Sequence, residues 1–198
     1  MGAARRGRQG GGGMTVRRHG GWRDLAWRAA YRLGYPAVRL WWRVRRPGHR
    51  GALACIRVDG HILLVRQSYR PGWTLPGGGV RPAEPPEAAA RREVLEETGL
   101  VLPALSPAVV LRGTWDGRRD EVHVFDASLD RLPPLRLDNR EVVEARLFAP
   151  GDLPGLRLSG PAADYLAWRG LRSGTSGSGD IRSTTCSSAA FVEKSRRR

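Results

Sequence analysis

The chain has 198 residues, 40% of them hydrophobic and 27% charged, which is typical of one soluble globular domain with tails. Its formal charge of +15 lies at the two ends, because residues 1–50 carry +12 and residues 171–198 carry +4, whereas residues 51–170 carry −1. Two cysteines exclude a disulfide framework and a cysteine-based zinc site and favour a cytoplasmic setting, and no run of 18 apolar residues predicts a membrane-spanning helix.

The N-terminal quarter of the chain is basic and falls into two parts. Residues 1–23 are rich in glycine and arginine, so we expect a disordered tail in which Met14 is an alternative start. Residues 24–50 carry aromatic and aliphatic residues at helical spacing among arginines, which predicts a basic amphipathic helix. We expect this helix to pack on the domain or on the partner in a homodimer. The alternative is contact with an anionic membrane surface or a nucleic acid.

Residues 51–170 have the pattern of a domain that mixes helices and strands. The dipeptide Asp59-Gly60 separates two apolar runs and is typical of a two-residue hairpin, and Gly99 is a helix C-cap. The expected elements are strands over residues 52–58 and 61–66, a helix over 87–98, strands over 109–115, 121–127 and 141–148, and a closing helix over 160–169. This order predicts an α+β domain built as an α/β/α sandwich. Residues 171–198, rich in Ser, Gly and Thr, are expected to be a second disordered tail.

Three carboxylates gather near the end of the helix expected over residues 87–98. Glu93, Glu96 and Glu97 fall within an arc of about 100°. Glu93 and Glu97 form a like-charge pair four residues apart, and anions are disfavoured at the C-terminal end of a helix. A hard divalent cation bound through carboxylate oxygens would offset both costs, so this face is a candidate metal site.

The spacing around these carboxylates is that of a known motif. Gly78 is followed after five residues by Glu84 and, after seven more, by Arg-Glu-Val-Leu-Glu-Glu-Thr-Gly-Leu over residues 92–100. This stretch resembles the Nudix box, G-x5-E-x7-R-E-U-x-E-E-x-G-U with U aliphatic, at every fixed position. The resemblance implies a Nudix-type α/β/α sandwich with a mixed sheet over residues 51–170. It also implies hydrolysis of a nucleoside diphosphate linked to another moiety, with Mg²⁺ or Mn²⁺ as cofactor.

The resemblance also assigns roles by position. The implied metal ligands are Glu93, Glu96 and Glu97, and the implied catalytic residues are Glu93, Arg92 and Glu97. Glu93 would help to deprotonate the attacking water, and Arg92 would orient a carboxylate of the box. Glu84 would support the loop, and the backbone at Gly78 would let it approach a metal or phosphate closely. Clustered carboxylates suit this chemistry because they recruit cations that neutralise a diphosphate and activate water.

Outside the box, the sequence offers further candidates for substrate or metal contact. Arg66 and Arg70 precede the box and are candidates for holding phosphates, with solvated surface arginine as the alternative. Glu141 or Glu144 resembles a strand glutamate that joins the metal site or acts as base in some Nudix proteins; the alternative is an exposed strand face. Gly78, Arg66, Arg70 and Glu144 are the expected substrate-binding residues.

Aromatic and acidic residues mark two further places where substrate could be recognised. Trp73 either stacks on a base or packs in the core, and packing is favoured. Trp115, Asp116 and Asp120 border the hairpin between the strands expected over residues 109–115 and 121–127.

Two classes of function remain at this point. The first is a metal-dependent hydrolase of a small nucleotide. The second is a protein in which the Nudix domain serves recognition while the basic ends bind RNA, DNA or anionic lipid. The near-neutral central region argues against a broad nucleic-acid face there. The box does not specify the substrate, because substrate choice lies in loops outside it.

Overall fold

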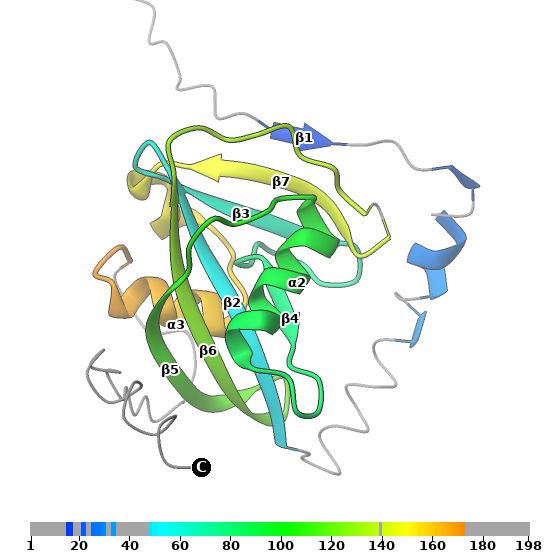
Figure 1. The fold of residues 1–198 in the computed structure, drawn as a ribbon. Coiled ribbons are helices and arrows are strands. Elements are labelled where there is room, and N and C mark those ends of the chain that lie inside the picture. The colour runs from blue at the N-terminus through cyan, green and yellow to red at the C-terminus, as the bar shows by residue number, and fades with distance from the viewer. Residues whose placement is uncertain are drawn as a thin grey trace, which may run out of the picture.

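The computed structural model describes residues 15–17, 21–22, 25–30, 33–34, 48–138 and 140–172. Within them the strands form one mixed seven-stranded sheet in the order β1-β7-β3-β2-β6-β5, with β4 paired to β2 (Figure 1). The elements are β1 (Thr15–Arg17), β2 (Gly48–Val58), β3 (His61–Gln67), β4 (Gly77–Gly79), α2 (Pro86–Thr98), β5 (Ser106–Trp115), β6 (Arg118–Leu129), β7 (Val142–Phe148), the 3₁₀ helix η1 (Pro150–Gly155) and α3 (Gly160–Trp168). The expected α+β class and mixed sheet are confirmed.

The strand β2 is the centre of the sheet. It pairs in parallel with β6 along its whole length, from Gly48 opposite Arg119 to Val58 opposite Leu129. It joins β3 through the predicted hairpin, in which Asp59 and Gly60 have φ angles of 48° and 73°. Two positive φ angles are what a tight hairpin turn between twisted strands requires.

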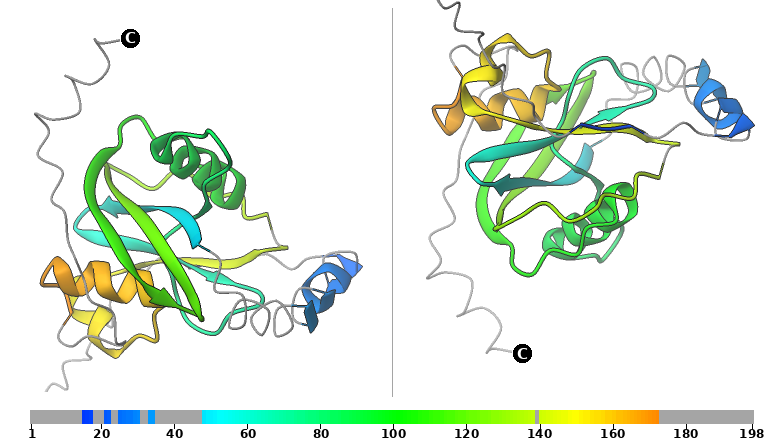
Figure 2. Two further views of the ribbon diagram at one scale, coloured as in Figure 1. Left: turned by 90° about the horizontal axis from the view of Figure 1, so that it is seen from below. Right: turned by 90° about the horizontal axis from the view of Figure 1, so that it is seen from above.

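Helices cover both faces of the sheet, as the sequence predicted. Because side chains alternate along a strand, Leu53 and Cys55 of β2 face the apolar cluster that contains Tyr165 of α3, whereas Ile56 faces the cluster that contains Val94 of α2. Figure 2 shows α2 and α3 on opposite sides of the sheet. The predicted α/β/α sandwich is therefore confirmed.

The helix that carries the box begins with proline and ends at glycine. Pro85 and Pro86 stand where a missing N–H costs nothing, and Gly99 takes a left-handed φ of 71° while its N–H donates to the carbonyl of Leu95 at 2.9 Å. Gly77–Gly79, for which the sequence predicted no strand, form β4, which pairs with residues 51–53 of β2. The pairing is close, because a Cβ atom at Gly77 would lie 2.2 Å from the carbonyl oxygen of Ala52.

The N-terminal expectations meet the structure only in part. Thr15–Arg17, expected to be disordered, form β1 antiparallel to β7, which corrects that part of the prediction. Residues 25–30 and 33–34 are helical, but residues 48–50, which the sequence placed in the same helix, belong to β2. The rest of both predicted tails and of the predicted helix lies outside the described residues, apart from residues 21–22 and 171–172. Among the described residues, every helix is too short or too polar to span a bilayer.

Candidate active site

The strand β4 presents a backbone without side chains to the acidic face of α2. A Cβ atom added at Gly78 would lie 2.7 Å from Oε2 of Glu93 and 2.9 Å from its Oε1. Only glycine therefore leaves room for the Glu93 carboxylate in its present position. The sequence motif thus places a bare backbone directly against a carboxylate.

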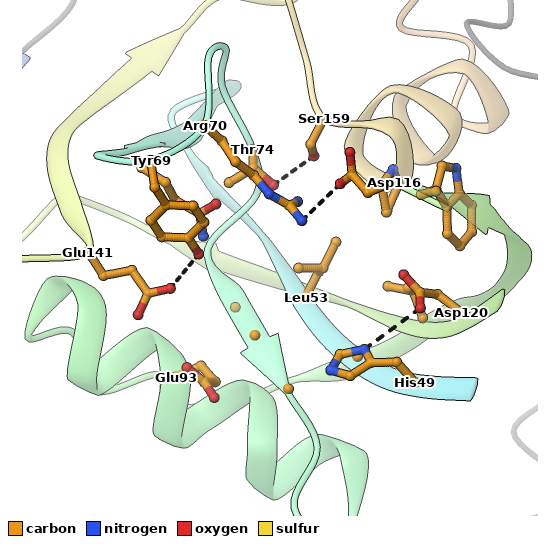
Figure 3. Close-up of a pocket in the computed structure, with 18 of the residues that line it drawn as sticks. His49, Leu53, Tyr69, Arg70, Thr74, Glu93, Asp116, Asp120, Glu141 and Ser159 are labelled. Atoms are coloured by element: carbon orange, nitrogen blue, oxygen red, sulfur yellow. Dashed lines mark hydrogen bonds and ion pairs between the residues drawn. The ribbon is translucent and has the colours of Figure 1, made fainter. Parts of the chain in front are cut away.

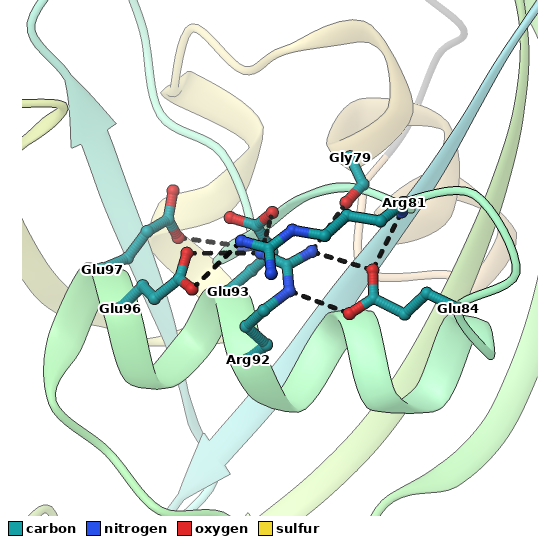
Figure 4. A network of polar contacts seen from close by, with 8 residues as sticks. Gly79, Arg81, Glu84, Arg92, Glu93, Glu96 and Glu97 are labelled. Atoms are coloured by element: carbon teal, nitrogen blue, oxygen red, sulfur yellow. Dashed lines mark hydrogen bonds and ion pairs between the residues drawn. The ribbon is translucent and has the colours of Figure 1, made fainter.

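Arg92 is the centre of the polar network on α2, shown in Figure 4. Its Nε donates to Oε1 of Glu84 at 2.8 Å and its Nη2 to Oε2 of Glu84 at 3.0 Å, which is a two-pronged ion pair. Nη2 also donates to the carbonyl of Gly79 at 3.0 Å. Nη1 donates to Oε1 of Glu93 at 2.7 Å and to Oε2 of Glu96 at 3.2 Å. One guanidinium therefore ties the loop to the helix and holds two carboxylates.

This network shifts the ionisation of the groups that it joins. Hydrogen bonds from Arg92 and from the backbone N–H of Arg81 lower the pKa of Glu84 to about 2. Burial raises the pKa of Glu93, and the hydrogen bond from Arg92 opposes that rise. Glu84 is therefore a fixed anion beneath the loop, whereas Glu93 is a partly desolvated carboxylate that lies against the backbone of Gly78.

Glu97 is the most buried acidic residue of α2, at 4% exposure. Its Oε2 accepts a hydrogen bond of 2.9 Å from the N–H of Gly77, yet burial raises its pKa well above the usual range for glutamate. A carboxylate buried at this cost fits a site whose charge a cation completes. Among the described residues, no three His, Cys, Asp or Glu side chains converge closely enough, as they lie, to enclose a metal ion. The oxygen donors themselves are those that Mg²⁺ and Mn²⁺ prefer.

Glu141, which precedes β7, is a further carboxylate near the acidic face of α2. Oε1 of Glu141 accepts a hydrogen bond of 2.5 Å from the hydroxyl of Tyr69. The backbone N–H groups of Glu141 and Val142 donate to Asp138, which fixes the segment before β7. Glu141 is thus held beside the box carboxylates by contacts that do not involve the box.

Glu93, Glu141 and Tyr69 are among the residues that line a cavity of about 620 Å³, whereas Glu96 and Glu97 are not. Glu93, Glu141 and Tyr69 lie at one end, and Asp116, Asp120 and His49 lie at the other, with Leu53 between them (Figure 3). The cavity thus has two chemically different ends, one beside the motif and one beside β5 and β6.

The structure brings together some of the predicted site residues and separates others. Gly78, Glu93 and Arg70 line the cavity, and Arg70 also pairs with Asp116 at 2.8 Å. The sequence also singled out Trp115 and Asp120, and both line the far end.

Two predicted substrate-binding residues are not among those that line the cavity. Arg66 and Glu144 stand opposite each other on β3 and β7 and form an ion pair at 2.5 Å. Trp73 packs edge-on against Phe148 at 4.8 Å between ring centres, the core role favoured from the sequence. The carboxylate of this segment that lines the cavity is Glu141.

His49 and Tyr69 are cavity residues that sequence reasoning missed. His49 was placed at the end of a helix, but it lies in β2 opposite Asp120 of β6. Only the pairing of two strands that are distant in sequence brings these side chains together, so no local pattern indicates it. Tyr69 lies in a loop, where no periodicity marks it.

Comparison with known proteins decides the family. The NUDIX domain model matches residues 47–168, more than half of the chain. This chain belongs to the Nudix hydrolase family. The Nudix match covers all the strands and helices from β2 to α3, so the basic segment before residue 47 and the tail after residue 168 lie outside the match.

Individual Nudix relatives agree with this assignment. Nucleoside triphosphatase NudI of Salmonella agona is 37% identical over 130 residues, which cover 59% of this chain and 92% of NudI. A Bacillus subtilis protein named "Putative 8-oxo-dGTP diphosphatase" is 40% identical over 95 residues, and the match spans 47% of this chain and 60% of that protein. The crystal structure of a MutT Nudix hydrolase from Burkholderia pseudomallei superposes with a TM-score of 0.55 at 29% identity, covering 61% of this chain and 97% of that one.

Proposed function

We propose that this protein hydrolyses a nucleoside triphosphate or a related nucleoside diphosphate derivative at a phosphoanhydride bond. The observation that carries the proposal is the acidic face of α2 against the bare backbone of Gly77–Gly79, at one end of a cavity of about 620 Å³. Pockets of roughly 300–1,000 Å³ are typical of sites for small molecules of this size. The match to nucleoside triphosphatase NudI covers 92% of NudI, and the name of that protein gives the triphosphate substrates that we propose here.

Glu93, Glu96 and Glu97 are the residues that would hold Mg²⁺ or Mn²⁺. When bound, such an ion neutralises phosphate charge and lowers the pKa of water. Arg92 donates to Glu93 and Glu96 and so fixes the orientation of both carboxylates. Glu93 accepts the proton of the attacking water. Gly77 and Gly78 let the phosphates approach the backbone closely, because no side chain stands in the way.

A panel of substrates tests this proposal. Deoxynucleoside and ribonucleoside triphosphates, nucleotide sugars and dinucleoside polyphosphates are incubated with Mg²⁺ or Mn²⁺, and the released phosphate or pyrophosphate is measured. We expect turnover of at least one triphosphate and its loss in Glu97→Gln. Glu87→Gln is the matched control, because Glu87 lies on the same helix, pairs with Arg91 at 3.0 Å and does not line the cavity. Undiminished turnover in Glu97→Gln would refute the assignment of the site.

The exposed apolar side chains before the domain favour a second role. Trp22, Leu25, Trp27 and Leu33 are 78%, 58%, 51% and 81% exposed in a segment that is rich in arginine. Basic segments with exposed tryptophan and leucine are typical of contact with anionic membrane surfaces. We propose that residues 1–46 dock the protein on such a surface. Because Trp27 also lines the cavity, the test replaces Trp22 and Leu33, which do not line it, by serine. Co-sedimentation with anionic vesicles should be lost in this double variant, while hydrolysis persists; binding to neutral vesicles, to RNA or to a second copy instead would contradict the proposal.

A further inference from the structure

The N-terminal helical segment contributes part of the cavity wall, although it lies outside the Nudix match. Trp27, Ala30 and Gly34 are among the residues that line the cavity. Their spacing is that of one helix face, and residues 25–30 and 33–34 are helical. Both views of Figure 2 show this segment (blue) on the side of the domain where the loop between β3 and β4 lies. The pocket is therefore completed by residues that the match to residues 47–168 does not include.

The same segment turns other apolar side chains to solvent. Trp22, Leu25 and Leu33 are 78%, 58% and 81% exposed, and none of them lines the cavity. On an ideal helix Leu25 and Trp27 point about 160° apart, because each residue turns the helix by about 100°. Trp27 is therefore set apart from the apolar residues of the proposed membrane surface and belongs to the cavity side.

This part of the wall has room for a flat group beside an aromatic ring. Trp27 is 51% exposed, so about half of its surface stays open whatever else it contacts. Ala30 carries only a methyl group, and a Cβ atom added at Gly34 would meet no atom within 4 Å. None of the three residues is charged. An indole beside two small residues suits the face of a nucleobase, because stacking needs a flat apolar surface.

The other tryptophan and the tyrosine that line the cavity are already engaged. Trp115 is 8% exposed, and its ring packs so closely on α3 that a Cβ atom at Gly160 would lie 2.2 Å from its Cδ1. The hydroxyl of Tyr69 donates to Glu141 at 2.5 Å, at the end of the cavity beside the box, where the phosphates are expected. Trp27 is therefore the indole with the most open surface along the cavity wall.

We infer that the indole of Trp27 stacks on the nucleobase of the substrate, and that it favours purines, because two fused rings cover more of an indole than a pyrimidine does. This inference rests on the proposed hydrolysis of nucleotides and assigns the base to a residue outside the Nudix match. The base is remote from the phosphoanhydride bond, so its stacking is the same in the ground state and in the transition state. Loss of Trp27 should therefore raise KM and leave kcat unchanged.

The test compares nucleotides with a probe that has no base. Ribose 5-phosphate carries a hydroxyl group in place of the base of AMP or GMP, and calorimetry with Mg²⁺ measures the binding of all three. A stacked base contributes about 10-fold to 100-fold in affinity, so the wild type should bind at least one of AMP and GMP more tightly than ribose 5-phosphate by that factor. Trp27→Ala should remove the difference, and Trp27→Phe should keep most of it. Trp22→Ala is the matched control, because Trp22 lies in the same segment and does not line the cavity.

A second variant fills the space beside the ring. Gly34→Leu places a side chain where an added Cβ has no neighbour within 4 Å, so the segment can accommodate it. It should weaken the binding of AMP or GMP and leave that of ribose 5-phosphate unchanged. Gly21→Leu is its control, because an added Cβ there is equally free and Gly21 does not line the cavity.

The outcomes separate this inference from the proposed function. Hydrolysis of a triphosphate with unchanged KM in Trp27→Ala overturns the inference and leaves the function intact. An equal loss of affinity for AMP, GMP and ribose 5-phosphate shows a structural role for Trp27 and also overturns it. The same holds if the wild type binds neither nucleotide more tightly than ribose 5-phosphate. Binding of AMP or GMP that depends on Trp27, without hydrolysis of any nucleotide, supports the inference and refutes the proposed function.

Discussion

Gly77 and Gly78 are neighbours in β4, yet alanine at each position is expected to damage a different property. At Gly78 the three atoms nearest to an added Cβ all belong to the carboxyl group of Glu93, at 2.7, 2.7 and 2.9 Å. Ordinary contact begins at 3.4 Å, so this carboxyl group must move by about 0.7 Å, the difference between 3.4 and 2.7 Å. It can move, because it is the end of a flexible side chain.

The displacement should appear in catalysis and hardly in stability. A misplacement of about 1 Å can cost about 100-fold in rate, so Gly78→Ala should lower kcat by about 10-fold to 100-fold. Its free energy of unfolding should change by less than about 1 kcal/mol. At Gly77 the added Cβ would instead lie 2.2 Å from the Ala52 carbonyl oxygen and 2.8 Å from the Leu53 Cα atom, at a φ of 136°. Backbone cannot move aside, so Gly77→Ala should lose about 3 kcal/mol or more of stability.

Steady-state hydrolysis and urea unfolding of both variants measure the two effects. Gly151→Ala is the control, because an added Cβ there has no neighbour within 4 Å. Wild-type kcat in Gly78→Ala would show that the position of the Glu93 carboxylate does not limit turnover. A loss of stability in Gly78→Ala as large as that in Gly77→Ala would show that β4, and not the carboxylate, absorbs the clash. Either result refutes the reasoning.

Three further substitutions test the site and its support. Glu97→Gln removes a buried charge, so the rise in Tm on adding Mg²⁺ or Mn²⁺ should vanish in thermal scans, and a full rise would contradict the metal assignment. Arg92→Lys cannot reproduce the two-pronged pair with Glu84, so kcat/KM should fall at least about 10-fold, and unchanged kinetics would show that this pair is dispensable. Trp115→Phe leaves the buried carboxylate of Asp164 without its indole donor and should cost about 1–3 kcal/mol in urea unfolding. Burial raises the pKa of Asp164 above the ordinary value of 3.8, and the hydrogen bond from Trp115 opposes this rise. The stability that this carboxyl contributes in its protonated form is therefore complete below pH 3.8 and is lost as the pH rises through the pKa of the folded state. The substitution raises that pKa further, so its cost should be larger at neutral than at acidic pH, and a cost independent of pH would contradict the argument.

Local spacing made the acidic helix predictable. The positions of Glu93 and Glu97 on one face, and the end of the helix at Gly99, follow from helical geometry and from the special conformation of glycine. The hairpin at Asp59-Gly60 was predictable for the same reason. In each of these cases the signal lies within a few residues.

The parts that could not be predicted depend on pairing between distant segments. Three glycines carry no alternation, so β4 became visible only through its fit against β2. The register between β3 and β7 sets Arg66 opposite Glu144 and shifts at the next residue, so alternation alone could not tell that Glu141 lines the cavity. The contact of His49 with Asp120 likewise requires the parallel pairing of β2 with β6.

The hairpin between β2 and β3 has a mechanical consequence. These strands pair directly only at Arg57–Ile62 and Val58–His61, so the sheet opens into a fork beyond the turn. The segment from Thr74 to Gly79 fills the fork, with Thr74 bridged to Val65 and β4 paired to β2. Glu141 belongs to one arm of this fork and the box helix to the other. A nucleotide that contacts both arms would hold them together. We therefore expect substrate binding to reduce the motion of the two arms relative to each other and so to make the whole sheet more rigid.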